Sequence, residues 1–147
     1  MSLHRFFFDA TVWISAIHKP AGFNAGLLNI ASHKTFVTLY SPGISEEITR
    51  WISKQKKPAK QLELSSRHVS LLQAIRPEQV QISSDDFSRW RDVPESDRHV
   101  VAAAVEGNAH IIVTGNLRHI NKPSVRGLVK YIMNPLQFLV WFKEIYG

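Results

Sequence analysis

Asp9 is the residue whose position most clearly suits chemistry. It stands directly after the apolar run Phe6–Phe8, and the residues after it are compatible with a helix. An apolar run that ends in a carboxylate is typical of a buried parallel strand, and open α/β sheets bind ligands just beyond the carboxyl ends of their strands. A strand-terminal Asp is also a common turn former or helix N-cap. A second apolar segment, His110–Asn116, also ends in a polar residue, and this repetition favours a ligand-binding site over a simple turn or cap.

Asp97 is a second candidate, because it is predicted to lie beside an apolar helix face. At about 100° per residue, it falls near the centre of the apolar stripe of a helix expected over residues 96–107, and His99 falls on the opposite side. An Asp on a buried face must be capped, paired or bound to a cation. An N-terminal carboxylate that only complements the helix dipole is an equally good interpretation.

Glu47 is the third candidate. In a helix that opens at Ser41 and Pro42, Glu47 borders the apolar stripe and Glu46 lies opposite. Glu46 can pair with Arg50 four residues later, as solvated helix pairs do. We therefore predict that Glu46 is more exposed than Glu47. The alternative for Glu47 is an ordinary carboxylate on a helix flank.

Carboxylates gathered at one sheet edge would bind cations. They repel one another unless positive charge sits between them, and oxygen ligands select hard ions such as Mg²⁺ or Mn²⁺. Such ions stabilise the attacking and leaving oxygens in phosphodiester hydrolysis. The net charge of +6 favours a polyanionic partner, nucleic acid first, although a basic solvated surface is the simpler explanation. Together these features favour a metal-dependent nuclease.

The elements that would position these residues alternate between strands and helices. We expect strands near residues 4–8, 35–40, 80–82, 110–114 and 129–133, and helices near 12–18, 22–33, 42–54, 60–75, 96–107 and 135–146. Alternation of this kind predicts a parallel sheet covered on both faces. The expected fold is a three-layer α/β/α sandwich with four or five parallel strands. No repeat or composition break divides residues 1–147, so we expect a single domain.

Composition excludes several other classes of function. The absence of cysteine excludes disulfide and thiolate chemistry and suits a reducing cytoplasm. No apolar stretch approaches the roughly 18–20 residues that a membrane span needs. The seven histidines show no zinc-type spacing. A glycine-rich phosphate loop is also missing, which argues against a nucleotide cofactor.

Five segments, spread in order through almost the whole chain, carry a family resemblance: Phe7–Ser15, Ser41–Ile48, Asp97–Ala104, Ile112–Asn116 and Ile132–Leu139. Together they resemble the PIN-domain family, metal-dependent ribonucleases that include the toxins of VapBC-type toxin–antitoxin pairs. The resemblance implies a PIN-like fold and endoribonuclease activity that depends on Mg²⁺ or Mn²⁺. It also implies RNA as substrate and an antitoxin protein or a second copy of the chain as partner.

The resemblance assigns catalysis to Asp9, Glu47, Asp97 and Asn116, with the three acids as metal ligands. Many members carry Asp after Thr-Gly, where this chain has Asn116, although some members do carry Asn there. An Asn can bind a metal through its carbonyl oxygen or hold a water, but it removes one negative charge. Thr11 keeps a hydroxyl that can orient the Asp9 carboxylate. We predict that the four residues converge in one pocket at the carboxyl edge of the sheet.

Basic residues near the same strand end are candidates for RNA contacts. Arg118, Lys122 and Arg126 follow Asn116 closely enough to hold phosphates. The run Arg89–Arg91 places a Trp between two cations, a pattern that can stack a base, although such a Trp is more often a core anchor.

Two other functional classes fit parts of the sequence. A catalytically weakened PIN-like domain would bind RNA or protein without cutting, and Asn116 supports that alternative. A phosphoryl-accepting receiver domain also places acids at strand ends. It requires paired acids after the first strand, and only Asp9 stands there, so the receiver is disfavoured.

Overall fold

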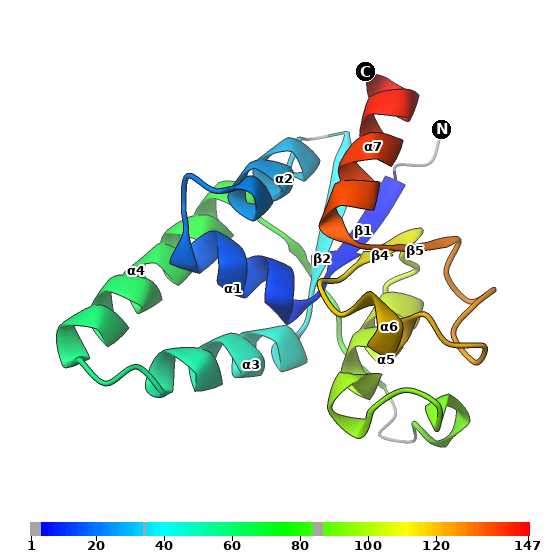
Figure 1. Ribbon diagram of the computed structural model, residues 1–147, viewed down its shortest axis with the longest axis horizontal. Coiled ribbons are helices and arrows are strands. Elements are labelled where there is room, and N and C mark those ends of the chain that lie inside the picture. Colours follow the sequence, from blue (N-terminus) through cyan, green and yellow to red (C-terminus); the bar gives the residue numbers. More distant parts are fainter. Residues whose placement is uncertain (1–3, 34, 84–86) are drawn as a thin grey trace.

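A five-stranded parallel sheet runs through the middle of the computed structural model, which describes residues 4–33, 35–83 and 87–147 (Figure 1). The strands are β1 (His4–Phe8), β2 (Phe36–Tyr40), β3 (Glu78–Gln79), β4 (Ile111–Val113) and β5 (Tyr131–Met133). Their order is β3-β2-β1-β4-β5, and every neighbouring pair is parallel. The carboxyl ends of all five strands therefore lie at one edge of the sheet.

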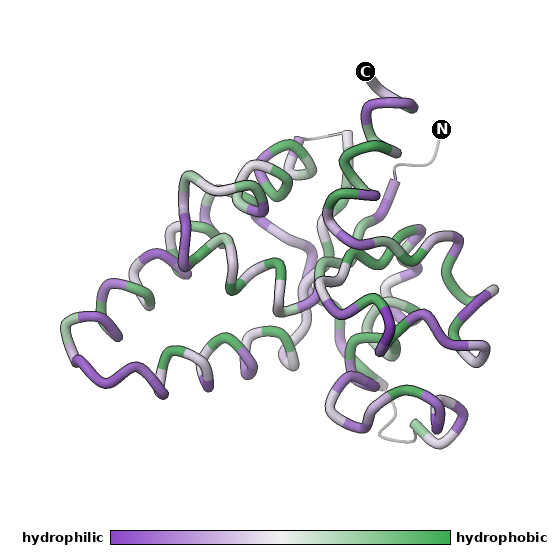
Figure 2. Tube along the Cα trace, viewed as in Figure 1, coloured by the Kyte–Doolittle hydropathy of each residue, from purple (hydrophilic) through white to green (hydrophobic). Residues whose placement is uncertain are grey.

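Helices connect the strands and cover the sheet. They are α1 (Ala10–His18), α2 (Phe23–Ala31), α3 (Pro42–Ser53), α4 (Pro58–Ile75), α5 (Arg98–Glu106), α6 (Leu117–Ile120) and α7 (Pro135–Tyr146), with 3₁₀ turns at Ser88–Trp90 and Glu95–Asp97. Figure 2 shows hydrophilic and hydrophobic residues alternating along α3 and α4, as in amphipathic helices. None of the described helices is long and apolar enough to cross a membrane.

Three helices lie on one face of the sheet. Phe6 of β1 packs on Phe138 of α7 with ring centroids 5.0 Å apart. Thr38 pairs in register with Phe6, so its side chain shares that face, and its hydroxyl donates to the last carbonyl of α2 at 3.2 Å. Two residues further along β2, on the same side, Tyr40 contacts Trp13 of α1, with ring centroids 5.0 Å apart. These contacts place α1, α2 and α7 in one layer.

The opposite face of the sheet is covered by α5. Leu39 pairs in register with Phe7 and therefore points away from the first layer. Gly107, which directly follows α5, lies so near Leu39 that a Cβ added to it would be 3.0 Å from the Leu39 Cδ1 atom. The α5 residues Val100–Ala104 are all buried. The predicted three-layer α/β/α sandwich with a parallel sheet is confirmed, with five strands.

Several local predictions differ from the structure at the ends of elements. The strand expected at residues 80–82 is wrong, because β3 consists of the exposed residues Glu78 and Gln79. This strand lies at the sheet edge, where apolar residues are not required, and Val80 instead packs in the core. The helices expected from residues 12 and 60 begin earlier, at Ala10 and Pro58. Proline suits the first helical position because its missing N–H would be unpaired there anyway.

Candidate active site

Asp9 lies buried at the point where β1 ends and α1 begins, with 4% of its surface exposed. Its side chain caps α1, because the Thr11 N–H donates to Asp9 Oδ1 at 3.1 Å. The N-cap interpretation is therefore correct. Asp9 Oδ1 also accepts from the Thr11 hydroxyl, and Oδ2 accepts from the Thr114 hydroxyl. The expected contact between the Thr11 hydroxyl and the Asp9 carboxylate is present.

Burial makes the Asp9 carboxylate costly to keep charged. It raises the pKa of the Asp9 carboxyl above its ordinary value, and hydrogen bonds from Thr11 and Thr114 oppose that rise. The donors are neutral hydroxyl and backbone groups, which hold a carboxylate in place without balancing its charge. Asp9 therefore has the chemistry of a cation ligand.

Thr114 links Asp9 to the loop that follows β4. Its side chain is fully buried, and its hydroxyl donates to Asp9 and accepts from the Asn116 N–H at 2.9 Å. Beside it, the Gly115 N–H donates to the Thr11 hydroxyl oxygen at 2.9 Å. A Cβ at Gly115 would lie 2.9 Å from that oxygen, so the close approach depends on glycine. Thr114 is not among the residues predicted for the site from the sequence.

Asn116 is exposed and directly precedes α6. With Arg118, His119 and Asn134 it lines a hollow of about 230 Å³. Asn134 caps α7 directly after β5, so it reaches the carboxyl edge of the sheet from the neighbouring strand. Asn134 is not among the predicted site residues, although its position after an apolar strand resembles that of Asp9.

Glu47 lies on the second turn of α3 and contacts α5. Its side chain is 27% exposed, whereas that of Glu46 is 75% exposed and pairs with Arg50 at 3.6 Å. The predicted order of exposure is confirmed. Glu47 Oε1 lies 2.9 Å from the Nε2 atom of His99.

The prediction that His99 lies on the outer face of its helix is wrong. Its side chain is only 20% exposed, because α5 packs against α3 as well as against the sheet. A helix that is buried on two sides has no single apolar stripe. The angle of His99 from one stripe therefore does not show whether its side chain is exposed.

Asp97 lies in the 3₁₀ turn just before α5 rather than inside the predicted helix. Its side chain is 18% exposed, and its Oδ2 atom lies 3.2 Å from the Nδ1 atom of His119 in α6. His119 follows Asn116 by three residues, so this contact brings the loop after β4 beside Asp97.

Separate sets of hydrogen bonds involve the predicted site residues. They run from Asp9 through Thr114 to Asn116, from His119 on α6 to Asp97, and from His99 on α5 to Glu47. Carboxylate and amide oxygens fit a hard divalent cation by their chemistry. Within the part of the chain that the structure describes, no three Asp, Glu or His residues are close enough together to hold a metal ion. Convergence of the four residues in one pocket therefore stays a prediction.

The basic candidates differ in their surroundings. Arg118 and Arg126 are exposed, and Lys122 is half-buried. The Arg126 guanidinium donates to the Asn121 side chain at 3.0 Å. Trp90 is buried, so it is the core anchor that the alternative interpretation expected, and it cannot stack a base.

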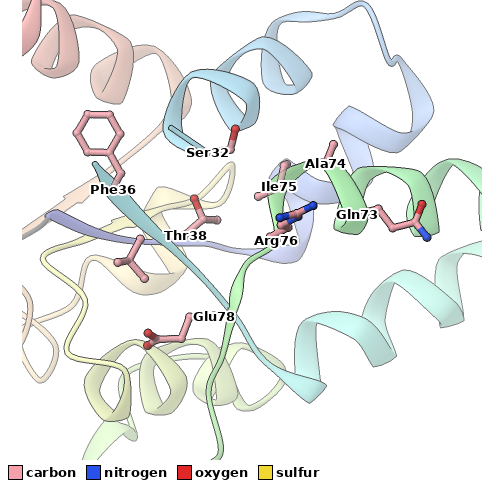
Figure 3. Close-up of a pocket in the computed structure, with 9 residues that line it drawn as sticks. Ser32, Phe36, Thr38, Gln73, Ala74, Ile75, Arg76 and Glu78 are labelled. Carbon is pink, nitrogen blue, oxygen red and sulfur yellow. The ribbon is translucent and has the colours of Figure 1, made fainter. Parts of the chain in front are cut away.

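A larger hollow lies at the other edge of the sheet. It measures about 690 Å³, and Phe36, Thr38, Ile75, Arg76 and Glu78 are among its lining residues (Figure 3). Phe36 and Glu78 are the first residues of β2 and β3, so this hollow opens at the amino edge. None of the predicted site residues lines it.

Comparison with known proteins gives a family and a fold. A family model described as a PIN domain matches residues 5–118. The fold is similar to a chain of VapBC2 from Rickettsia felis, solved with a DNA fragment from its promoter, with TM-score 0.68, 18% identity and coverage of 88% of this chain and 98% of that one. DNA-bound VapBC from Salmonella typhimurium is similar at TM-score 0.66 and 17% identity, covering 90% and 99%. No curated protein matches.

Proposed function

Because this chain belongs to the PIN-domain family, we propose that it is an endoribonuclease dependent on Mg²⁺ or Mn²⁺ and the toxin of a toxin–antitoxin pair. The observation that supports it most is the buried Asp9 carboxylate at the end of the central strand, joined through Thr114 to the Asn116 loop. The likeness in fold to chains of two VapBC complexes supports an antitoxin as partner. A second copy of the chain is a further proposed partner.

In this proposal, Asp9, Asp97 and Glu47 hold the ion, which supplies Lewis acidity at the scissile phosphodiester. Thr11 and Thr114 fix the two oxygens of Asp9 by hydrogen bonds. The exposed side-chain amide of Asn116 can orient a water molecule. Arg118, Lys122 and Arg126 provide positive charge for the RNA backbone, and this contribution should weaken as salt is added.

Cleavage of RNA should require a divalent cation. We expect the purified protein to cut single-stranded RNA with Mg²⁺ or Mn²⁺ and to lose that activity in EDTA, because three acids cannot face a phosphate without a cation. The assay is gel analysis of an end-labelled RNA, with added excess Mn²⁺ after EDTA as the recovery control. Cleavage that continues unchanged in EDTA would contradict the metal mechanism.

Replacement of Asn116 with Asp should maintain or raise cleavage. The substitution restores the acidic residue common in the family and adds a negative oxygen ligand at an exposed position. The measurement is kcat/KM at a series of Mn²⁺ concentrations, where Asn116→Asp should reach half-maximal rate at lower Mn²⁺. Asn29→Asp on the exposed side of α2 makes the same charge change elsewhere and is the control. A large loss of activity in Asn116→Asp alone would show that the amide itself is needed.

The second candidate function is a PIN-like domain that binds RNA or protein without cutting. Two observations favour it: Asn116 in place of an acid, and no ion-holding group of three among the described acids and histidines. Retained RNA binding without cleavage, in both the wild type and Asn116→Asp with every divalent ion tried, would select this candidate.

A further inference from the structure

We infer that His99 is a positioning residue for the Glu47 carboxylate, and that Gly43 is a glycine because His99 occupies the space of its side chain. The catalytic meaning of this inference rests on the proposed function, but the contacts do not. Gly43 and Glu47 are four residues apart on α3, so they share one face of that helix. The His99 imidazole of α5 lies against both of them.

The two ring nitrogens of His99 have different surroundings. Nε2 lies 2.9 Å from Glu47 Oε1. A carboxylate can only accept, so Nε2 carries the hydrogen and donates it. Nδ1 is buried and has no hydrogen-bond partner among the residues that the structure describes. A neutral ring with its hydrogen on Nε2 leaves no unpaired N–H at Nδ1, so one tautomer suits both surroundings.

Gly43 is explained by space rather than by backbone conformation. Its φ is not positive, because Gly127 is the positive-φ glycine among the described residues. Glycine is also a poor residue within a helix. A Cβ at this position would overlap His99 Nδ1 and would lie 3.0 Å from Cε1 and Cγ. Any other residue would therefore displace the ring from its hydrogen bond with Glu47.

The consequence of this packing is a Glu47 side chain with restricted motion. A partner that holds a metal-ligating carboxylate orients it and adjusts its basicity, and loss of such a partner typically costs about 10–100-fold in metal affinity or activity. Glu47 is partly exposed at 27%, so without His99 its carboxylate would be free to take up solvated rotamers.

The first test compares His99→Ala with His99→Gln. His99→Ala should weaken Mn²⁺ binding, measured by calorimetry, and lower kcat by about 10–100-fold each. His99→Gln should recover most of both, because the Gln amide can donate from nearly the same place as Nε2. A purely structural role predicts a lower Tm in both variants with unchanged Mn²⁺ affinity, and that result would overturn the inference.

The second test uses Gly43→Ala, alone and combined with His99→Ala. Alone, it should weaken Mn²⁺ binding about as much as His99→Ala does. In the His99→Ala background it should have no further effect, because the atom that it would displace is gone and the two effects are not additive. Gly26→Ala on α2 is the matched control, since an added Cβ there meets nothing within 4 Å. Additive losses, or a harmless Gly43→Ala, would contradict the inference.

Failure of the inference and failure of the proposed function can be distinguished. If the wild type does not cut RNA but the variants alter Mn²⁺ affinity as described, the function fails and the inference holds. If the wild type neither cuts RNA nor binds Mn²⁺, ¹⁵N NMR of the histidine side chains tests whether His99 holds Glu47. The inference requires a hydrogen-bonded His99 Nε2–H whose resonance shifts in Glu47→Ala, and a resonance that Glu47→Ala leaves unchanged overturns it.

Discussion

Replacement of Asp9 with Asn should abolish RNA cleavage and raise the stability of the protein at the same time. The loss of a central ligand should lower kcat by about a thousandfold or more, since a bound ion contributes several kcal/mol to the transition state. RNA binding should persist or strengthen, because one negative charge that faces the phosphates is removed.

Stability should increase in the same variant because Asp9 is a buried charge. The carboxylate is 4% exposed, and burial raises its pKa, so the charged form is disfavoured in the folded protein. An Asn of nearly the same shape can still accept from Thr11, and its amide can donate to the Thr114 oxygen. We expect about 0.5–2 kcal/mol of added stability in EDTA, the usual scale for one stabilising substitution.

Thermal unfolding in EDTA and RNA cleavage in Mn²⁺ measure the two effects separately. The control is Glu46→Gln, which removes one negative charge at a side chain that is 75% exposed and should change neither activity nor Tm appreciably. A less stable Asp9→Asn would mean that the hydrogen bonds from the two threonines outweigh the cost of burial. Full activity in Asp9→Asn would remove Asp9 from the proposed site.

Replacement of Thr114 with Val should reduce both activity and stability. Val has nearly the same shape but no hydroxyl, so Asp9 Oδ2 loses a donor and the Asn116 N–H loses its acceptor. The Asp9 oxygen is buried, and a buried polar group left unpaired costs about 1–3 kcal/mol. We expect kcat to fall as well, because the Thr114 hydroxyl no longer fixes Asp9 and Asn116 relative to each other.

Thr114→Ser separates these two losses. Ser keeps the hydroxyl and removes one buried methyl group, which costs about 1 kcal/mol of stability. We therefore expect Thr114→Ser to unfold at a lower temperature than the wild type while its kcat stays close to the wild-type value. Thermal unfolding and RNA cleavage, measured on the wild type, Thr114→Val and Thr114→Ser, test this. Equal activity in the Val and Ser variants would show that the hydroxyl does not position the site.

The sequence by itself determined the features that depend on neighbouring residues. The apolar run before Asp9 predicts a strand that ends at a polar position, and the pair Ser41 and Pro42 predicts the start of α3. The phase of α3 separates Glu46 from Glu47 correctly. These predictions succeed because strand ends, helix caps and helix phase are set within a few residues of chain, and α3 presents a single apolar face to the protein.

Only the tertiary structure decided which groups hold the acids. The donor to Asp9 Oδ2 is 105 residues away in the chain, and the partner of Glu47 is 52 residues away. Periodicity within one element cannot report such pairs, because they depend on how β4 lies beside β1 and how α5 lies beside α3. The same reason explains the error at His99. A helix that packs against both a sheet and a second helix has two buried sides, and its sequence pattern does not show which neighbour covers each side.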